Sequence, residues 1–223
     1  MRPRVAARAR PASPERQRLQ LDERRAQLIE LGLTLFADRA YDEVSIDDIA
    51  AAAGVSKGLL YHYFGSKRAF YVETVRAGAA LLRERTRTDP SLPPVDRARA
   101  GIEGYLAFVE SNARAYASLM RSGIGNDPEV AAVVEETRDA IVGQILEDTG
   151  TTDRPVFRFA VRSWVGLVEA ASLDWIERRE VGRDVALAMM IDSLYGSLAI
   201  ALRFDPEGGF RFGEILPGGQ RTP

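Results

Sequence analysis

Residues 45–70, SIDDIAAAAGVSKGLLYHYFGSKRAF, decide the fold of this 223-residue chain. The pattern predicts a short helix, a tight turn at Gly54 and a second short helix, followed by the start of a third. Ser45 with Asp48 three residues later matches a capping box at a helix start. Gly54 supplies the positive φ that a sharp turn between helices needs, and Ser56 caps the next helix. Two helices joined by a short turn containing glycine are typical of a helix-turn-helix motif.

An ordinary helical hairpin inside a larger bundle has the same spacing, so the motif alone leaves two interpretations open. The distribution of charge favours DNA binding, although the formal net charge is only -2. Residues 1–25 hold eight arginines against three acidic residues, and residues 56–87 hold seven basic residues against two acidic ones. Residues 26–55 and 88–223 are acidic overall. This segregation indicates that one part of the chain meets phosphate and the rest does not.

The composition excludes several classes of site. The chain has no cysteine and a single histidine, His62. Disulfides and thiolate metal sites are therefore excluded, and His-rich metal sites and Ser-His-Asp triads are disfavoured. We predict no catalytic residue, no metal and no cofactor. Since no run of about 18 apolar residues occurs and no apolar stretch follows the basic N-terminus as in a secretory signal, we expect no membrane partner and a cytoplasmic location.

The apolar spacing predicts an all-α fold in four parts. Residues 1–20, rich in Arg, Ala and Pro, are expected to form a disordered basic arm, which either keeps the protein soluble or adds contacts to DNA. Residues 21–66 form the helix-turn-helix domain, and residues 67–204 form a second helical domain. Residues 205–223, rich in Gly and Pro, are expected to form a flexible tail.

The last two long helices, expected over residues 154–180 and from residue 182 onward, are apolar on more than one face. One apolar stripe can pack into the core of the same chain. The second stripe requires another partner, and a symmetric homodimer through a four-helix bundle supplies one. The alternative is that both helices are central in a monomeric bundle.

Together these features resemble the TetR/AcrR family of bacterial transcriptional regulators. The match covers residues 22–75, and its segments are LFA at 35–37, YDEVSIDDIA at 41–50, AGVSKGLLYHYF at 53–64 and GSKR at 65–68. The resemblance implies a three-helix DNA-binding domain, a fourth helix that leads to an effector domain, and dimerisation through the last two long helices. It also implies binding to a palindromic operator and release when a small molecule occupies the effector domain.

The predicted DNA contacts lie at and near the start of the second helix of the motif. Lys57 can donate to guanine O6 or N7, and Gly58 lets the helix approach the groove floor. The resemblance makes Tyr61 and Lys67 phosphate contacts, and Lys67 also lies at a helix start, where free N–H groups favour an anion. A core position is the alternative for Tyr61. The full set is Ser45, Ser56, Lys57, Gly58, Tyr61, His62 and Lys67.

The effector domain is less informative in sequence. We expect a cavity among the helices between residues 95 and about 180. Few charged residues fall at apolar-face positions there, which favours an apolar or amphipathic effector. Plain core packing is the alternative for each candidate. The candidate lining residues are Tyr105, Phe108, Tyr116, Met120, Phe159, Trp164 and Trp175.

The sequence thus predicts a ligand-responsive, dimeric DNA-binding regulator rather than an enzyme. We expect a repressor that a small, apolar or amphipathic effector releases from a palindromic double-stranded DNA operator. One alternative is a DNA-binding regulator without a small-molecule effector, switched by a protein partner. The other is an enzyme with an appended helix-turn-helix, which is disfavoured because no Gly-rich phosphate loop and no metal-ligand cluster are present.

Overall fold

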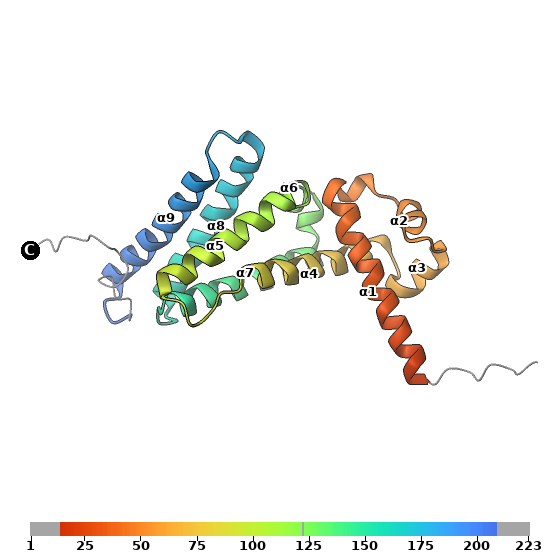
Figure 1. The fold of residues 1–223 in the computed structure, drawn as a ribbon, viewed down its shortest axis with the longest axis horizontal. Helices are drawn as coiled ribbons and strands as arrows, with labels where there is room; N and C mark the ends of the chain where they lie inside the picture. The colour runs from red at the N-terminus through yellow and green to blue at the C-terminus, as the bar shows by residue number, and fades with distance from the viewer. Residues whose placement is uncertain (1–13, 122, 209–223) are drawn as a thin grey trace, which may run out of the picture.

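The computed structural model describes residues 14–121 and 123–208, and every regular element in these ranges is helical. The prediction of an all-α fold is confirmed. The short helices α2 and α3 lie at one end of an elongated molecule, and α8 and α9 lie toward the other (Figure 1). The elements are α1 (Pro14–Asp38), the 3-10 helix η1 (Tyr41–Glu43), α2 (Ile46–Ala53), α3 (Lys57–Phe64), α4 (Lys67–Arg85), α5 (Pro94–Ser111), α6 (Ala113–Arg121), the 3-10 helix η2 (Gly123–Asn126), α7 (Pro128–Asp148), α8 (Pro155–Arg178) and α9 (Arg183–Phe204).

The helix-turn-helix is built by the local signals that the sequence contains. The Ser45 hydroxyl accepts a hydrogen bond from the backbone N–H of Asp48, whose carboxylate accepts from the Ser45 N–H at 2.8 Å. Gly54 ends α2 with φ 62°. Ser56 caps α3 and Ser66 caps α4. The predicted capping box, turn and helix starts are therefore confirmed.

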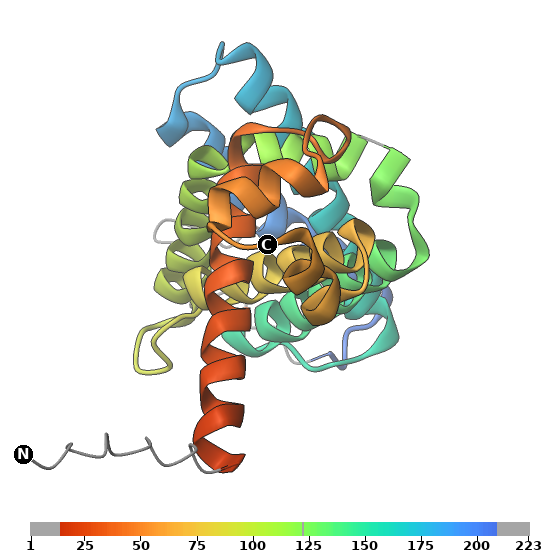
Figure 2. The same ribbon diagram turned by 90° about the vertical axis from the view of Figure 1, so that its right-hand side faces the viewer.

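The structure corrects the two ends of the predicted domain organisation. Helix α1 begins at Pro14, so residues 14–20, which were expected to be disordered, are helical. Proline is favoured in the first turn of a helix, and the Glu, Arg, Gln and Leu residues that follow are good helix formers. Figure 2 shows that this end of α1 extends past the rest of the molecule. The arm prediction for residues 1–13 lies outside the described residues.

The beginning of the predicted flexible tail is held against the fold. Asp205 accepts a hydrogen bond from Arg154 Nε at 2.5 Å. The backbone of Gly208 lies so close to the Phe157 ring that a Cβ atom would overlap it. Residues 205–208 are thus ordered by contacts with the start of α8, and the prediction for residues 209–223 lies outside the described residues.

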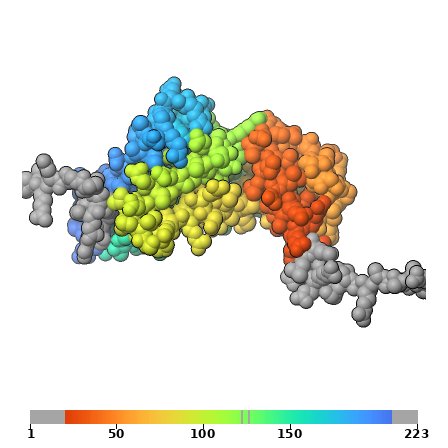
Figure 3. All heavy atoms as spheres, viewed as in Figure 1, coloured from red at the N-terminus to blue at the C-terminus, as the bar shows by residue number. Residues whose placement is uncertain are grey.

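Two hydrophobic cores are joined by α4. The N-terminal core contains Leu28, Phe36, Ile49, Leu60, Phe70 and Val130 of α7, and the second core joins α5, α7, α8 and α9. Helix α4 packs against α1 at one end and against α5 and α7 along its length. At its C-terminal end, the Thr86 carbonyl oxygen accepts a hydrogen bond from Gln144 Nε2 at 2.6 Å. Figure 3 shows α4 and α5 between the N-terminal lobe and the lobe formed by the last helices.

In the described part of the chain, α9 is the one helix long and apolar enough to cross a membrane, by length and composition alone. Of its most apolar window, 44% is buried inside the protein. Leu187, Leu194 and Leu198 belong to the second core, as expected for a central helix of a bundle.

Candidate DNA interface and effector cavity

The candidate DNA contacts of α3 share one exposed face. Lys57 and Tyr61 are four residues apart, as are Gly58 and His62, so each pair lies on the same side of the helix. The opposite side carries Leu60, which is 1% exposed. Tyr61 is 49% exposed, so the alternative that placed it in the core is wrong.

Lys57 and Ser45 each contact an acidic side chain of α2. Lys57 Nζ lies 2.5 Å from Asp47 Oδ1 of α2, and both side chains are more than half exposed. Because an exposed ion pair contributes little free energy, a base or phosphate can replace Asp47 at small cost. The Ser45 hydroxyl donates to the Asp48 carboxylate at 2.8 Å. Ser45 must give up that bond before it can donate to a phosphate.

Lys67 and Arg68 follow the Ser66 cap and point to different partners. The Lys67 ammonium lies 4.0 Å from the centroid of the Tyr41 ring, a cation–π distance. Arg68 Nε and Nη2 donate to the two carboxylate oxygens of Asp127 at 2.5 and 2.7 Å, and Nη1 donates to Glu129 at 2.7 Å. These hydrogen bonds hold the pKa of Asp127 below its usual value. The start of α4 is therefore tied to the start of α7.

The role of Arg68 was not predicted from the sequence. Arg68 and its partners lie in two separate sequence motifs, the GSKR segment and the Asn-Asp-Pro-Glu segment at 126–129. Each is a helix start, but nothing in the sequence places the two side by side. A second connection of the same kind joins Arg114 of α6 to Glu43 at 3.1 Å.

A cavity of about 230 Å³ lies between α4 and the helices of the second core. It extends from Trp164 and Leu194 to Phe36 and Tyr41 in the N-terminal domain. Five of the seven predicted lining residues border it, and their role in effector binding stays a prediction. These five are Tyr105, Phe108, Tyr116, Met120 and Trp164.

Phe159 and Trp175 do not border the cavity, so the prediction is wrong for both. Phe159 is 75% exposed on the outer face of α8. Trp175 is buried, but its Nε1–H donates to the Val181 carbonyl oxygen at 2.8 Å and the Arg179 guanidinium lies 4.7 Å from its ring. The apolar pattern of α8 identifies a helix with apolar residues on two faces but not which face borders the cavity.

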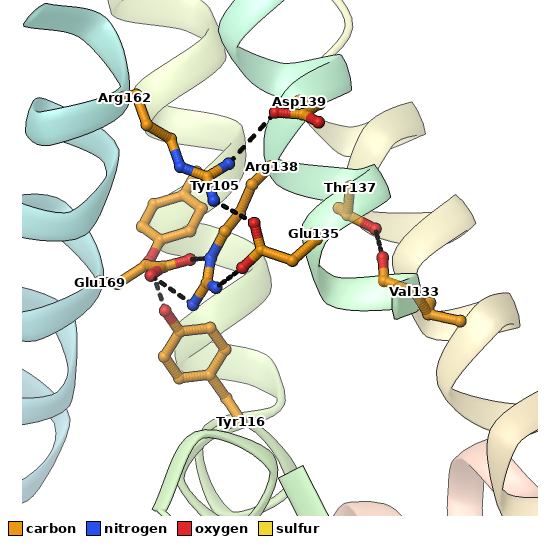
Figure 4. A network of polar contacts seen from close by, with 9 residues as sticks. All are labelled: Tyr105, Tyr116, Val133, Glu135, Thr137, Arg138, Asp139, Arg162 and Glu169. Carbon is orange, nitrogen blue, oxygen red and sulfur yellow. Dashed lines mark hydrogen bonds and ion pairs between the residues drawn. The ribbon is translucent and has the colours of Figure 1, made fainter. Parts of the chain in front are cut away.

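The cavity wall also carries a polar cluster that the sequence analysis did not predict. Arg138 of α7 donates to both carboxylate oxygens of Glu169 of α8 at 2.8 Å, and to Glu135 at 2.5 Å. Next to them, the Tyr105 and Tyr116 hydroxyls are hydrogen-bonded to each other at 2.8 Å. Figure 4 shows these side chains converging from α5, α6, α7 and α8. The expectation of few charged residues at inward positions is therefore wrong at this end of the cavity.

Burial makes the hydroxyls of both tyrosines of this cluster weaker acids than usual. It raises the pKa of Tyr105 to about 12, and it raises the pKa of Tyr116 above its ordinary value. Both hydroxyls are consequently protonated throughout the physiological pH range. They can donate and accept hydrogen bonds without carrying charge.

Comparison with known proteins agrees with this arrangement. Residues 28–74 match the family model described as "Bacterial regulatory proteins, tetR family", and residues 94–196 match the "Tetracyclin repressor-like, C-terminal domain". The HTH-type transcriptional activator FasR of Mycolicibacterium smegmatis is 32% identical over 85% of this chain and 90% of its own length. The chain belongs to the tetR family.

Solved structures support the same assignment for this tetR-family protein. A tetR-family transcriptional regulator from Streptomyces coelicolor has a TM-score of 0.77 and 33% identity, and covers 83% of this chain and 85% of its own. Among relatives found by sequence, the HTH-type transcriptional repressor KstR2 of Rhodococcus jostii is 24% identical over 83% of this chain and 81% of its own length. The tetR-family protein is therefore a DNA-binding transcriptional regulator and not an enzyme. Its relatives include both activators and repressors.

Proposed function

We propose that the protein is a dimeric repressor that leaves a palindromic operator when a small apolar or amphipathic molecule enters the cavity. One observation carries this proposal: α4 forms part of the cavity wall and bears Lys67 at its N-terminal end. Thr74, Gly78 and Leu82 place one face of α4 against the cavity. A ligand that prefers one position of α4 therefore changes the position of the candidate DNA-binding residues.

The cavity favours a small molecule over a protein partner as the signal. An effector domain without internal space would have supported the alternative of a regulator switched by another protein. Instead, the cavity of about 230 Å³ approaches the range of about 300–1,000 Å³ typical of ligand pockets. Most of its wall is aliphatic or aromatic, which suits an apolar body.

The division of labour at the DNA interface predicts different results for the two lysines. Lys67→Ala should weaken binding to all DNA sequences similarly and reduce the salt dependence by about 0.9 log units per log unit of salt, as expected for one lost phosphate contact. Lys57→Ala should change which sequence is preferred, because Lys57 lies on the face of α3 that meets base edges. Titration of operator variants with each mutant measures both effects. Equal, sequence-independent losses from both mutants would contradict a sequence-reading role for Lys57.

The outer faces of α8 and α9 support the dimer. Phe159 and Leu167 of α8 and Met189, Ile200 and Phe204 of α9 are each 49–76% exposed. A symmetric partner that packs the same two helices against them would bury these side chains in a four-helix bundle. Analytical ultracentrifugation at micromolar concentration should give a dimer mass, and a monomer mass would contradict this part of the proposal.

Ligand response is tested by filling the cavity. Compounds are first screened for release of the operator, which protein-protected genomic fragments identify. Ala79→Phe places a ring into the cavity wall of α4 and should raise the concentration for half-release about tenfold or more, since about 1.4 kcal/mol of lost binding corresponds to tenfold. Ala80→Phe is the matched control, because Ala80 is exposed and does not border the cavity. The same dose response in both variants would contradict ligand binding in this cavity.

The direction of regulation is proposed from the relatives. KstR, KstR2 and DhaR are named as repressors, whereas FasR is named as an activator. We propose repression in the cytoplasm, where the operator would be accessible. Deletion of the gene should raise transcription from the promoter at the operator, and a fall would indicate activation.

A further inference from the structure

The charged side chains around the cavity already have partners of opposite charge. In the described part of the chain, three arginines border the cavity, and each lies near a carboxylate. The two acidic residues on the wall are among these partners. The pairs are Arg39 with Asp48 at 3.3 Å, Arg97 with Asp148 at 3.6 Å, and Arg138 with Glu169 at 2.8 Å. The Arg97 pair is the weakest of the three, because its distance exceeds that of a hydrogen bond and Arg97 Nε is buried without a hydrogen-bond partner.

Arg138 has little capacity left for an anionic ligand. Its Nε and Nη2 groups are aligned with the two oxygens of Glu169, and its Nη1 group donates to Glu135. A carboxylate ligand would have to displace Glu169, whose side chain is 18% exposed. The displaced carboxylate would then remain largely desolvated without its partner, which is unfavourable.

The neighbouring tyrosine pair does have free hydrogen-bonding capacity. Its two hydroxyls carry two hydrogens, and the bond between Tyr105 and Tyr116 uses one of them. The Ser172 hydroxyl is a further hydrogen-bond partner of Tyr105, and the hydrogen-bonding capacity that is left on the two tyrosine hydroxyls is available to a ligand. Because both residues border the cavity, a polar group of a ligand can reach them without breaking an ion pair.

The field of Glu169 acts on this position. Burial is the main cause that raises the pKa of both tyrosine hydroxyls, and the negative charge of Glu169 adds to it, partly offset at Tyr116 by Arg138. A negative group bound to the hydroxyls would experience the same repulsion, which is strong where water is excluded. A positive group would compete with Arg138 for Glu169, but Arg138 already holds both carboxylate oxygens in a bidentate pair.

We propose that the cavity selects an uncharged amphipathic molecule whose hydroxyl, carbonyl or amide group hydrogen-bonds to the Tyr105–Tyr116 pair. The apolar body of the ligand lies along the aliphatic part of the wall. The Arg138–Glu169 pair contributes selectivity, because each of its charges already has a partner beside the tyrosine pair and neither can be paired with an ionised ligand without breaking that contact. This inference rests on the proposed function, in which a small molecule occupies the same cavity.

The direct test compares three probes that share one alkyl chain and differ in head group. Octan-1-ol is neutral at pH 7.5, whereas octanoate is negative and octylamine is positive. Calorimetric titration of the full chain should give a dissociation constant for octan-1-ol about tenfold or more below those of the two ions, as expected when charged groups are left unpaired.

Variants of the wall separate the two parts of the inference. Glu169→Gln removes the acidic partner and should improve octanoate binding about tenfold while octan-1-ol binding changes little, since Arg138 then loses the charge of Glu169 and one of its two acceptors there. Glu135→Gln is the matched control, because Glu135 also pairs with Arg138 but does not border the cavity; octanoate binding should stay weak. Tyr116→Phe removes one hydroxyl and should weaken octan-1-ol binding about five- to tenfold. Thermal unfolding of each variant verifies that it is folded.

Three results would overturn the inference. They are tighter binding of octanoate or octylamine than of octan-1-ol, unchanged selectivity in the folded Glu169→Gln variant, and no binding of octan-1-ol up to its solubility limit. None of these results removes the proposed function, which depends on whether any compound releases the operator and whether Ala79→Phe blocks that response. Conversely, an operator complex that no compound affects would remove the proposed function even if octan-1-ol binds.

Discussion

Gly104→Ala is expected to destabilise the protein by about 3 kcal/mol, at the upper end of the cost of overpacking. A Cβ atom at this position would overlap the Arg85 carbonyl oxygen and would lie 2.9 Å from the Arg85 carbonyl carbon. The neighbour is backbone at the end of α4, so no side chain can move aside. Helix α5 would therefore have to shift away from α4. The cost of this shift exceeds the gain of about 1 kcal/mol that replacing glycine by alanine normally brings within a helix.

Gly101→Ala on the same helix provides the control. A Cβ atom there would lie 3.5 Å from the Thr86 carbonyl oxygen and from Thr88 Cγ2, which is ordinary contact distance. This variant should therefore be stabilised by about 0.5–1 kcal/mol, because alanine favours the helix. Thermal unfolding of both proteins measures the difference, and for a chain of this size 1 kcal/mol corresponds to about 2–4 °C in Tm. Equal Tm values for the two variants would show that α4 and α5 are not in close backbone contact.

Arg138→Met is expected to have the second largest effect. It should lower the free energy of unfolding by about 2–3 kcal/mol. Removing one partner of a buried pair costs about 3–5 kcal/mol because the other charge stays buried without compensation. We expect the lower value because 25% of the Arg138 side chain and 18% of the Glu169 side chain are exposed. Methionine preserves much of the volume of the arginine stem, so a cavity does not account for the loss.

The double variant Arg138→Met/Glu169→Leu distinguishes charge from packing. Replacing both partners by apolar residues leaves no desolvated charge, so this protein should be more stable than Arg138→Met alone. Glu135→Gln should cost less than about 1 kcal/mol, because Glu135 is half exposed and exposed pairs contribute little. Urea unfolding of the wild type and the three variants gives their free energies of unfolding. A double variant that is no more stable than Arg138→Met would rule out the unpaired charge as the cause.

The DNA-binding half was largely predictable because its signals are local. The capping side chains of Ser45 and Ser56 act within three residues. Gly54 adopts the left-handed conformation because glycine has no Cβ atom to oppose it. The exposed face of α3 follows from helical periodicity once Leu60 is placed in the core. The start of α1 at Pro14 was missed because a helix of polar residues has no apolar periodicity to reveal it.

The effector half was predictable as a set of helices but not as a site. Trp164 and Trp175 occupy similar apolar positions on α8, yet Trp164 borders the cavity and Trp175 packs against the loop before α9. Phe159 was assigned to the cavity because aromatic residues are usually buried, but it is exposed in the single chain. Which apolar side faces a neighbour, a cavity or a second copy depends on how α8 is rotated in the bundle.

For this protein, the sequence alone determined the helices, their caps, the helix-turn-helix and the separation of basic and acidic parts. Each of these depends on residues a few positions apart, whose energies are set by backbone conformation and helical periodicity. Only the tertiary structure decided that Arg68 joins α4 to α7, that Arg138 meets Glu169, and that Tyr105 meets Tyr116 at the cavity wall. These partners lie on different helices, and the packing of those helices, which no local pattern encodes, brings them together.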